Sequence, residues 1–406
     1  DLAQQEEWTR SNEAFNLAPP KIIYRPNPAV LVLIDGDPKF QPMENTKLEF
    51  LANSAFFIVR PQGGKTYYLR GAGFWFTASD LTGTWQATDQ LPQELQEISR
   101  KIEEDEKKQA AEMAKDAGEM GAEKSSDNTP PEVVVRTEPA ELVFTTGDPD
   151  FASVAGTQLL YLRNTDSDVL MDINSQEYFI LVAGRWYQSR SLDDGPWKFV
   201  EPDDLPGDFA KIPVDSDMSN VLASVAGTQE AREAVLDNQI PQTAEVDRKT
   251  AKTSVSYDGD PRFESCGAGV SYALNTDKSV LLIDGTYYCC DEAIWFVSNG
   301  PEGPWAVATE LPAKIQDLPP ECPVYNVKYV TIYESTPEVV YVGYTPGYYG
   351  SYVYGPCVIY GTGWYYRPWY GRYYYPRPVT YGFGVHYSPY SGWGFTFGIS
   401  SGWLNV

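Results

Sequence analysis

The chain has 406 residues, 42 % of them hydrophobic and 21 % charged, which is enough apolar material for about three folded units. It carries 31 Lys and Arg against 56 Asp and Glu, and the formal charge of −25 argues against nucleic acid or an anionic membrane surface as a partner. A single histidine, His386, excludes metal centres built on several histidines and leaves one position for a Ser-His or Cys-His pair.

The first residues and the cysteines favour a location outside the cytoplasm. The sequence begins at Asp1 without an initiator Met, which fits a removed leader or a missing start. Its longest aliphatic run, residues 29–34, is far shorter than the ~20 residues of a spanning helix, so we expect no transmembrane segment. The cysteines match no zinc spacing, and we expect disulfides in a secreted, cell-surface or periplasmic protein; the five are Cys266, Cys289, Cys290, Cys322 and Cys357.

A Gly-Asp-Pro-x-Phe motif occurs three times, at residues 36–40, 147–151 and 259–263, with starts 111 and 112 residues apart. Four further landmarks follow each copy in the same order: an Asn before Ser or Thr, an aromatic group around a Trp, a Gly-x-Trp and a Leu-Pro. This order predicts three homologous units. The repeated tryptophans are expected to anchor three cores, with repeated lectin-like sites as the alternative; they are Trp75, Trp186, Trp295, Trp85, Trp197 and Trp305.

Short β-branched and aromatic runs fill each copy, separated by Asn, Asp, Gly and Pro, which is typical of antiparallel hairpins. In the third copy, residues 280–283 and 286–289 flank Asp284-Gly285, which favours a two-residue turn with positive φ at both positions. The predicted fold is mainly β: three homologous antiparallel β-meander repeats of about 111 residues with helical inserts, plus an aromatic β-hairpin-rich C-terminal region.

Two inserts between the copies have helical patterns, and both are expected to be packing struts or spacers. Leu95, Ile98 and Ile102 share one face of a charged helix. Thr228 is a good N-cap for a shorter helix with the apolar face Ala231, Ala234, Val235 and Leu236. The expected parts are an N-terminal arm (1–22), β repeat 1 (23–92), a charged helical insert (93–131), β repeat 2 (132–206), a linker with a short helix (207–243), β repeat 3 (244–322) and a Tyr/Gly-rich C-terminal β region (323–406).

The C-terminal region, residues 323–406, differs in composition from the rest. It holds 19 of the 29 tyrosines and carries a charge of +2, whereas residues 1–322 carry −27. Turns at 345–347 and 361–363 are expected to close hairpins. Its aromatic rings could pack on the three sheets, form a self-association surface or stack on sugars. The candidate contact residues for assembly or glycan are Trp364, Trp369, Tyr365, Tyr366, Trp393 and Trp403.

No motif for catalysis or for a cofactor emerges. Asp-Gly-Asp at 35–37 and 258–260 resembles a calcium loop only slightly, and a tight turn explains it better. His386 stands in an aromatic strand, where a packed or exposed side chain is expected rather than a base. The sequence therefore predicts no catalytic residue, no metal and no cofactor, and the protein is not expected to be an enzyme.

Two cysteine pairings are compatible with the repeat pattern. A bond from Cys266 to Cys289 or Cys290 would replace an apolar contact of the other copies, and only one of these neighbours can reach it because adjacent strand residues point to opposite faces. Cys322 and Cys357 flank the start of the C-terminal region and could pin it. One thiol would then remain free or bond another molecule.

Several motifs resemble a family of large exported bacterial proteins without an assigned activity, some of them labelled carbohydrate-binding family V/XII-like. The resemblance covers most of residues 132–400 and implies an extracytoplasmic bacterial protein. The motifs are Trp186-Tyr187 to Gly195-Pro196-Trp197, Ile240-Pro241-Gln242-Thr243, Pro323-Val324-Tyr325-Asn326-Val327 and the run Tyr375-Pro376-Arg377-Pro378-Val379-Thr380-Tyr381-Gly382-Phe383-Gly384.

The expected function is that of a non-catalytic extracellular or cell-surface structural protein that self-associates. Opposed charges of the body and the C-terminal region favour a head-to-tail contact, which propagates into a filament or surface layer unless it closes into a ring. The partner would be the chain itself. The alternative is a carbohydrate-binding protein for polysaccharide or cell-wall glycan.

Overall fold

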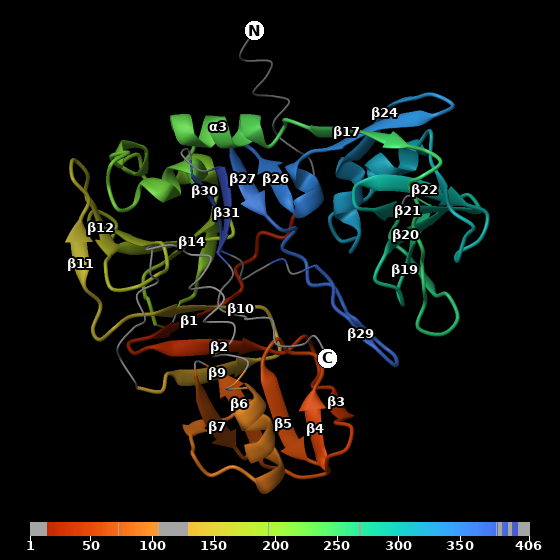
Figure 1. Cartoon of the computed structure of the whole chain (residues 1–406). Coiled ribbons are helices and arrows are strands. Elements are labelled where there is room, and N and C mark those ends of the chain that lie inside the picture. Colours follow the sequence, from red (N-terminus) through yellow and green to blue (C-terminus); the bar gives the residue numbers. More distant parts are fainter. Residues whose placement is uncertain are drawn as a thin grey trace. The chain divides into compact units, whose positions relative to one another are not determined.

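The computed structural model describes residues 14–71, 73–102, 104, 129–193, 195–267, 269–378 and 380, and the backbone of 384–388 and 392–396 (Figure 1). These residues form mainly antiparallel β-sheets, which confirms the predicted fold class. The chain divides into a smaller unit, which contains Asn27–Glu138, and a larger unit that combines the residues up to Pro26 with Pro139–Ile399. None of the described helices is long and apolar enough to cross a membrane.

The smaller unit contains the first of three six-stranded sheets, in which antiparallel strands follow chain order. A helix at residues 93–102 covers one face, and Leu95 is fully buried beside Trp75. Val32 and Val135 belong to the core on the sheet's other side. The strands of this first sheet are β3 (Phe40–Pro42), β4 (Leu48–Leu51), β5 (Phe57–Pro61), β6 (Tyr67–Gly71), β7 (Phe74–Ala78) and β8 (Gln86–Ala87).

The larger unit contains two further sheets with the same strand order. The second sheet consists of β11 (Phe151–Ser153), β12 (Leu159–Leu162), β13 (Val169–Asp172), β14 (Glu177–Val182), β15 (Arg185–Ser189) and β16 (Lys198–Val200). The third sheet consists of β18 (Phe263–Ser265), β19 (Val270–Ala273), β20 (Ser279–Ile283), β21 (Thr286–Asp291), β22 (Ile294–Ser298) and β23 (Ala306–Val307).

A tryptophan on the fifth strand of each sheet is tied to the segment that follows that sheet. The indole N–H of Trp75 donates to the Ser99 hydroxyl over 2.9 Å. Trp186 donates to the carbonyl of Ser224 over 2.7 Å, and Trp295 to that of Val330 over 3.0 Å. All three rings are buried, as expected of core anchors. Among the tryptophans of the Gly-x-Trp landmark, Trp85 is buried, whereas Trp197 and Trp305 are half-buried.

Short helices form the segments that cover the second and third sheets. After the second sheet come η1 (Pro202–Asp204), η2 (Phe209–Lys211), η3 (Ser219–Ser224) and α3 (Gln229–Asp237). After the third come η4 (Ala313–Asp317) and η5 (Tyr325–Tyr329). Thr228 caps α3 as predicted, since its hydroxyl accepts from the Ala231 N–H over 3.1 Å. The predicted apolar face is wrong at one position, because Leu236 is 60 % exposed.

Two parallel strand pairs join segments that are far apart in the sequence. In the larger unit β1 (Lys21–Arg25) lies parallel to β10 (Ala140–Phe144), and in the smaller unit β2 (Ala29–Leu33) lies parallel to β9 (Glu132–Arg136). The C-terminal region contributes β24 (Val330–Ser335), β25 (Val339–Tyr344), η6 (Pro346–Tyr349), β26 (Ser351–Tyr354), β27 (Cys357–Tyr360), β28 (Trp369–Tyr370), β29 (Tyr374–Tyr375), β30 (Gly384–Ser388) and β31 (Gly392–Thr396).

The turns expected at 345–347 and 361–363 do not close hairpins. Residues 346–349 form η6, because β25 pairs with β24 and with β17 (Gln242–Asp247) rather than with β26. The hairpin that does form here, β26–β27, turns at Gly355 with a φ of 55°. In the third sheet, the predicted Asp284-Gly285 turn is confirmed, with φ values of 49° and 82°.

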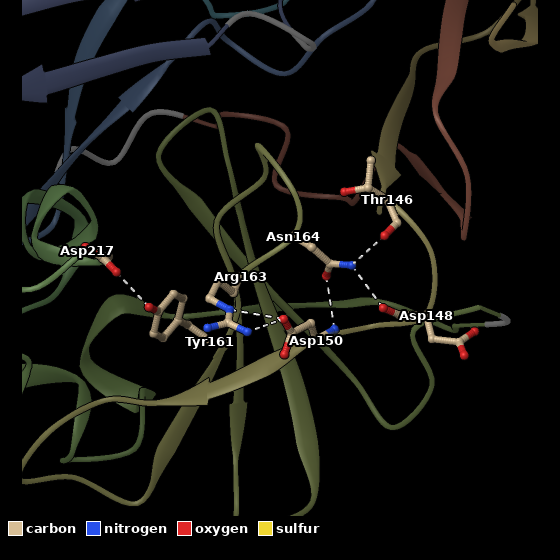
Figure 2. A network of polar contacts seen from close by, with 7 residues as sticks. All are labelled: Thr146, Asp148, Asp150, Tyr161, Arg163, Asn164 and Asp217. Atoms are coloured by element: carbon tan, nitrogen blue, oxygen red, sulfur yellow. Dashed lines mark hydrogen bonds and ion pairs between the residues drawn. The ribbon is translucent and has the colours of Figure 1, made fainter. Parts of the chain in front are cut away.

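The same arrangement of hydrogen bonds occurs in all three sheets and explains why Asn recurs after each Gly-Asp-Pro-x-Phe motif. In the second sheet the Asn164 amide donates to the carbonyls of Thr146 and Asp148 over 3.2 and 2.9 Å and accepts from the Asp150 N–H over 3.0 Å (Figure 2). Asn53 and Asn275 make the same three bonds in the other two sheets. We call this arrangement the Asn clamp; it supports reading Asp-Gly-Asp as a tight turn.

Candidate functional site

Three of the six C-terminal aromatics singled out from the sequence hold the larger unit together. Trp369 donates its indole N–H to the Asp258 carboxylate over 3.3 Å, and the Tyr373 N–H reaches the same carboxylate over 3.1 Å. Arg372 adds a third bond of 3.1 Å. Burial acts to raise the pKa of Asp258, but these hydrogen bonds outweigh it and leave the pKa lowered. The hairpin β28–β29 is therefore fastened to the first turn of the third sheet.

The neighbouring candidates divide between interior and surface. Tyr366 is buried and its hydroxyl bonds with Thr362 and the Pro320 carbonyl. Trp364 is half-buried and donates to the Ala14 carbonyl over 2.9 Å, which ties the N-terminal arm to this region. Tyr365 is 46 % exposed. The side chain of Trp393 and all of Trp403 lie outside the described residues, as does the side chain of His386.

A second attachment joins the C-terminal region to the second sheet. Arg185 is 1 % exposed, and its guanidinium donates to the carbonyls of Tyr360 and Gly361, each over 2.8 Å. Val358 and Tyr360 of β27 pack against Ala234 of α3. Packing on the sheets, one of the three roles left open by the sequence, is thus what the described part of the C-terminal region does.

The structure holds all five cysteines as free thiols, and the expected pairings stay predictions. Cys289 and Cys290 point to opposite faces of β21 and lie in separate cores, the first near Thr253 and the second near Tyr348. Cys266 instead contacts Cys322 through a hydrogen bond between the thiols. Cys357 is buried in β27, apart from Cys322.

Two of the exposed tyrosines of the described C-terminal region lie on the three-stranded sheet β17–β25–β24. Val340 and Val342 of β25 face the core, whereas Tyr341 between them is 38 % exposed. Tyr333 of β24 is 53 % exposed and crosses Gly343, where an added Cβ would lie 2.8 Å from the Tyr333 ring. Glycine thus lets this ring lie close against the sheet. We call this outer surface the tyrosine face.

Two carboxylates flank Tyr341 on the tyrosine face. Glu245 on β17 and Glu334 on β24 stand opposite Tyr341 in the strand register. The Tyr341 hydroxyl bonds to Glu245, and the two carboxylates raise the pKa of Tyr341, Glu245 most strongly. Tyr333 is the extra residue of a bulge between Ile332 and Glu334, and a bulge re-aims the side chains next to it.

A groove of about 410 Å³ runs beside β24, at the edge of the tyrosine face. One wall is β24 itself, including Tyr333. The opposite wall is formed by residues 309–313 and Gln316, and its side chains supply hydroxyl, carboxylate, amide and apolar groups. Hydrogen-bonding groups beside an aromatic ring and an apolar floor can hold a ligand that is itself part polar and part apolar.

The charge of this site is negative. Glu245, Glu310 and Glu334 lie on it, and the groove lining includes no Lys or Arg. Among the described residues, no group of three or more His, Cys, Asp or Glu side chains is placed to hold a metal ion. The site can therefore accept hydrogen bonds from hydroxyl groups and stack on apolar faces, but it repels anions.

Comparison of the chain with protein-family models, with curated proteins and with solved structures returned no match. The tyrosine face was not among the sequence candidates. A signal for it was present, since Tyr341 alternates with Val340 and Val342 and must lie on the opposite side of the strand. The position of Glu245 beside it had no sequence signal, because β17 pairs with β25 almost a hundred residues later.

Proposed function

We propose that this chain is a non-catalytic, extracytoplasmic binding protein for a neutral polysaccharide, with the tyrosine face and the adjoining groove as its contact surface. The observation that carries the proposal is the arrangement of Tyr333 and Tyr341 as exposed rings on one sheet, with two carboxylates beside Tyr341. Aromatic rings cover the apolar faces of sugars, and carboxylates accept strong hydrogen bonds from sugar hydroxyls.

Charge favours this function over self-association at the same surface. The protein carries −25, and three carboxylates lie on the site, so a second copy would bring like charges together. A neutral glycan meets no such repulsion. Moreover, the C-terminal aromatics whose exposure would favour assembly are largely engaged inside the larger unit, as Trp369 and Tyr366 show.

Retention of the purified chain on insoluble neutral polysaccharides tests the proposal. Tyr333→Ala and Tyr341→Ala should each reduce retention about tenfold or more, since an aromatic contact is worth ~1–2 kcal/mol. The matched control is Tyr373→Ala, which removes a tyrosine that is 62 % exposed but lies on the β28–β29 hairpin. Equal retention of all three variants, or retention of none of the proteins on any neutral glycan, would contradict the proposal.

Self-association is the second candidate, and the free edge of β24 favours it. The Tyr329 carbonyl accepts from the Thr345 N–H, so these two residues form a hydrogen-bonded pair of the antiparallel strands β24 and β25. Because bonded and non-bonded pairs alternate along such strands, the backbone N–H and C=O of Ile332 point away from β25, toward the groove. An edge of this kind can accept a strand from another chain.

Ile332→Pro separates the two candidates, because proline removes the outward N–H without touching the tyrosine rings. If the chain assembles through β24, sedimentation of the parent protein shows large species that disappear in this variant. If it binds glycan, the parent sediments as a monomer and the variant keeps its retention on polysaccharide.

A further inference from the structure

Two cysteines far apart in sequence meet within one core of the larger unit. Cys322 is 1 % exposed in the core of the third sheet, and Cys266 is half-buried against the same core. The two thiols are hydrogen-bonded to each other. Their meeting joins the loop between β18 and β19 to the segment that leads into η5 and β24.

Backbone hydrogen bonds hold both cysteines in place. The Cys266 N–H donates to the Val270 carbonyl over 3.0 Å, which closes the loop between β18 and β19. The Cys322 N–H donates to the Pro319 carbonyl over 2.9 Å, and its own carbonyl accepts from Tyr325 over 2.9 Å. These bonds hold the two residues in the positions from which their thiols contact each other.

Of the other three cysteines, Cys290 shares the core of Cys322, whereas Cys289 and Cys357 lie outside it. Burial raises the pKa of Cys289 and of Cys357 to about 12, and it raises the pKa of Cys290 as well. All three are buried. By contrast, the hydrogen bond from Cys322 lowers the pKa of Cys266. Cys266 is also the most accessible of the five cysteines. Cys266 is thus the thiol best suited to react with an external oxidant.

We propose that Cys266 and Cys322 form a structural disulfide when the folded chain meets an oxidising compartment. The oxidant is a small disulfide. The Cys266 thiolate attacks one of its sulfurs, forms a mixed disulfide and releases the first small thiol. Cys322 then attacks the Cys266 sulfur and releases the second. One S–S bond is broken and one is made, and the two protons leave on the two released thiols.

The consequence is a covalent tether at the start of β24. Cys322 stands ahead of η5, and Val330, the first residue of β24, accepts the Trp295 indole N–H over 3.0 Å. The disulfide would link the segment between Cys322 and β24 to the β18–β19 loop, and the Trp295 hydrogen bond links the same segment to the third sheet. This inference stands independently of the proposed function, since it requires only the cysteine geometry.

Peptide mapping under non-reducing conditions tests the proposal on the intact protein. After incubation of the chain with oxidised glutathione, the map should contain one cross-linked peptide pair, carrying Cys266 and Cys322, that dithiothreitol separates. The melting temperature should rise by roughly 5–10 °C relative to the reduced protein. Cys266→Ser should abolish both effects, whereas Cys357→Ser should retain both.

Two results would overturn the proposal: a cross-link from Cys266 to Cys289 or Cys290, or full alkylation of Cys266 and Cys322 after incubation with the oxidant. Because the map is read on the unmodified chain, a serine variant that fails to fold does not affect this decision. Alkylation of the native reduced protein is a second measurement, in which Cys266 should react before the four buried cysteines.

Discussion

At the scale of single residues, the Asn clamp shows how one side chain fixes a turn. Asn275 is fully buried, and its amide satisfies the carbonyls of Asp258 and Asp260 and the N–H of Arg262, each over 2.9 Å. Only a carboxamide offers two donors and an acceptor in this geometry. The clamp also orients Asp258, the residue that holds the β28–β29 hairpin, so the turn serves both the sheet and the C-terminal region.

Replacing Asn275 by Ala should lower the free energy of unfolding of the larger unit by about 2–3 kcal/mol, because three hydrogen bonds are lost and buried backbone groups remain unsatisfied. The control is Asn174→Ala, at an exposed asparagine, which should change stability by less than about 0.5 kcal/mol. Urea unfolding measures both. Similar midpoints for the two variants would show that the clamp contributes little.

At the scale of elements, the contact between β27 and the β14–β15 turn depends on the absence of a side chain. An added Cβ on Gly184 would lie 2.4 Å from the Val358 carbonyl oxygen, closer than real Cβ atoms approach. The turn residues Ala183 and Gly184 have φ values of 49° and 75°, and the Ala183 carbonyl accepts from the Tyr360 N–H over 3.0 Å. Glycine thus allows β27 to lie directly on the turn.

Two glycines with nearly the same φ allow the energy of this close contact to be distinguished from the energy of backbone strain. Gly184 has a φ of 75°, and Gly156 has a φ of 76° with nothing near its absent Cβ. Gly156→Ala should cost only the left-handed backbone penalty of about 1–2 kcal/mol. Gly184→Ala should cost about 1–3 kcal/mol more, because β27 must move away. Chemical denaturation compares them, and equal losses would mean that the close approach carries no energy.

At the scale of the whole molecule, one unit is inserted in the sequence of another. The smaller unit, Asn27–Glu138, has its own sheet, and its two cores draw only on its own residues. It leaves and rejoins the larger unit through neighbouring strands, since β1 and β10 pair in the larger unit and β2 and β9 in the smaller. Its ends therefore lie close together, as is usual for inserted domains.

A fragment of residues 27–138 should fold without the rest of the chain, because its cores are complete. We expect a cooperative thermal transition for the isolated fragment, and calorimetry of the full chain should resolve more than one transition. A fragment that shows no cooperative unfolding, or a full chain that melts in a single two-state step, would contradict independent folding.

The sequence by itself determined the features that depend on neighbours along the chain. Apolar alternation and Asp-Gly indicated the β20–β21 hairpin, Thr228 indicated the start of α3, and the repeated motifs indicated where each sheet begins. These are short-range effects, because the φ that a residue prefers and the face of the strand on which its side chain lies both follow from local sterics.

Only the tertiary structure decided which distant segments meet. In the folded chain Cys322, rather than Cys289 or Cys290, lies beside Cys266. The Trp369 indole donates to Asp258 and is not left as a free surface group. The tertiary structure also exposed Tyr333 and Tyr341 by pairing β25 with β17 and β24. Burial of an aromatic ring or a thiol depends on what packs over it from elsewhere in the chain, and composition does not specify that partner.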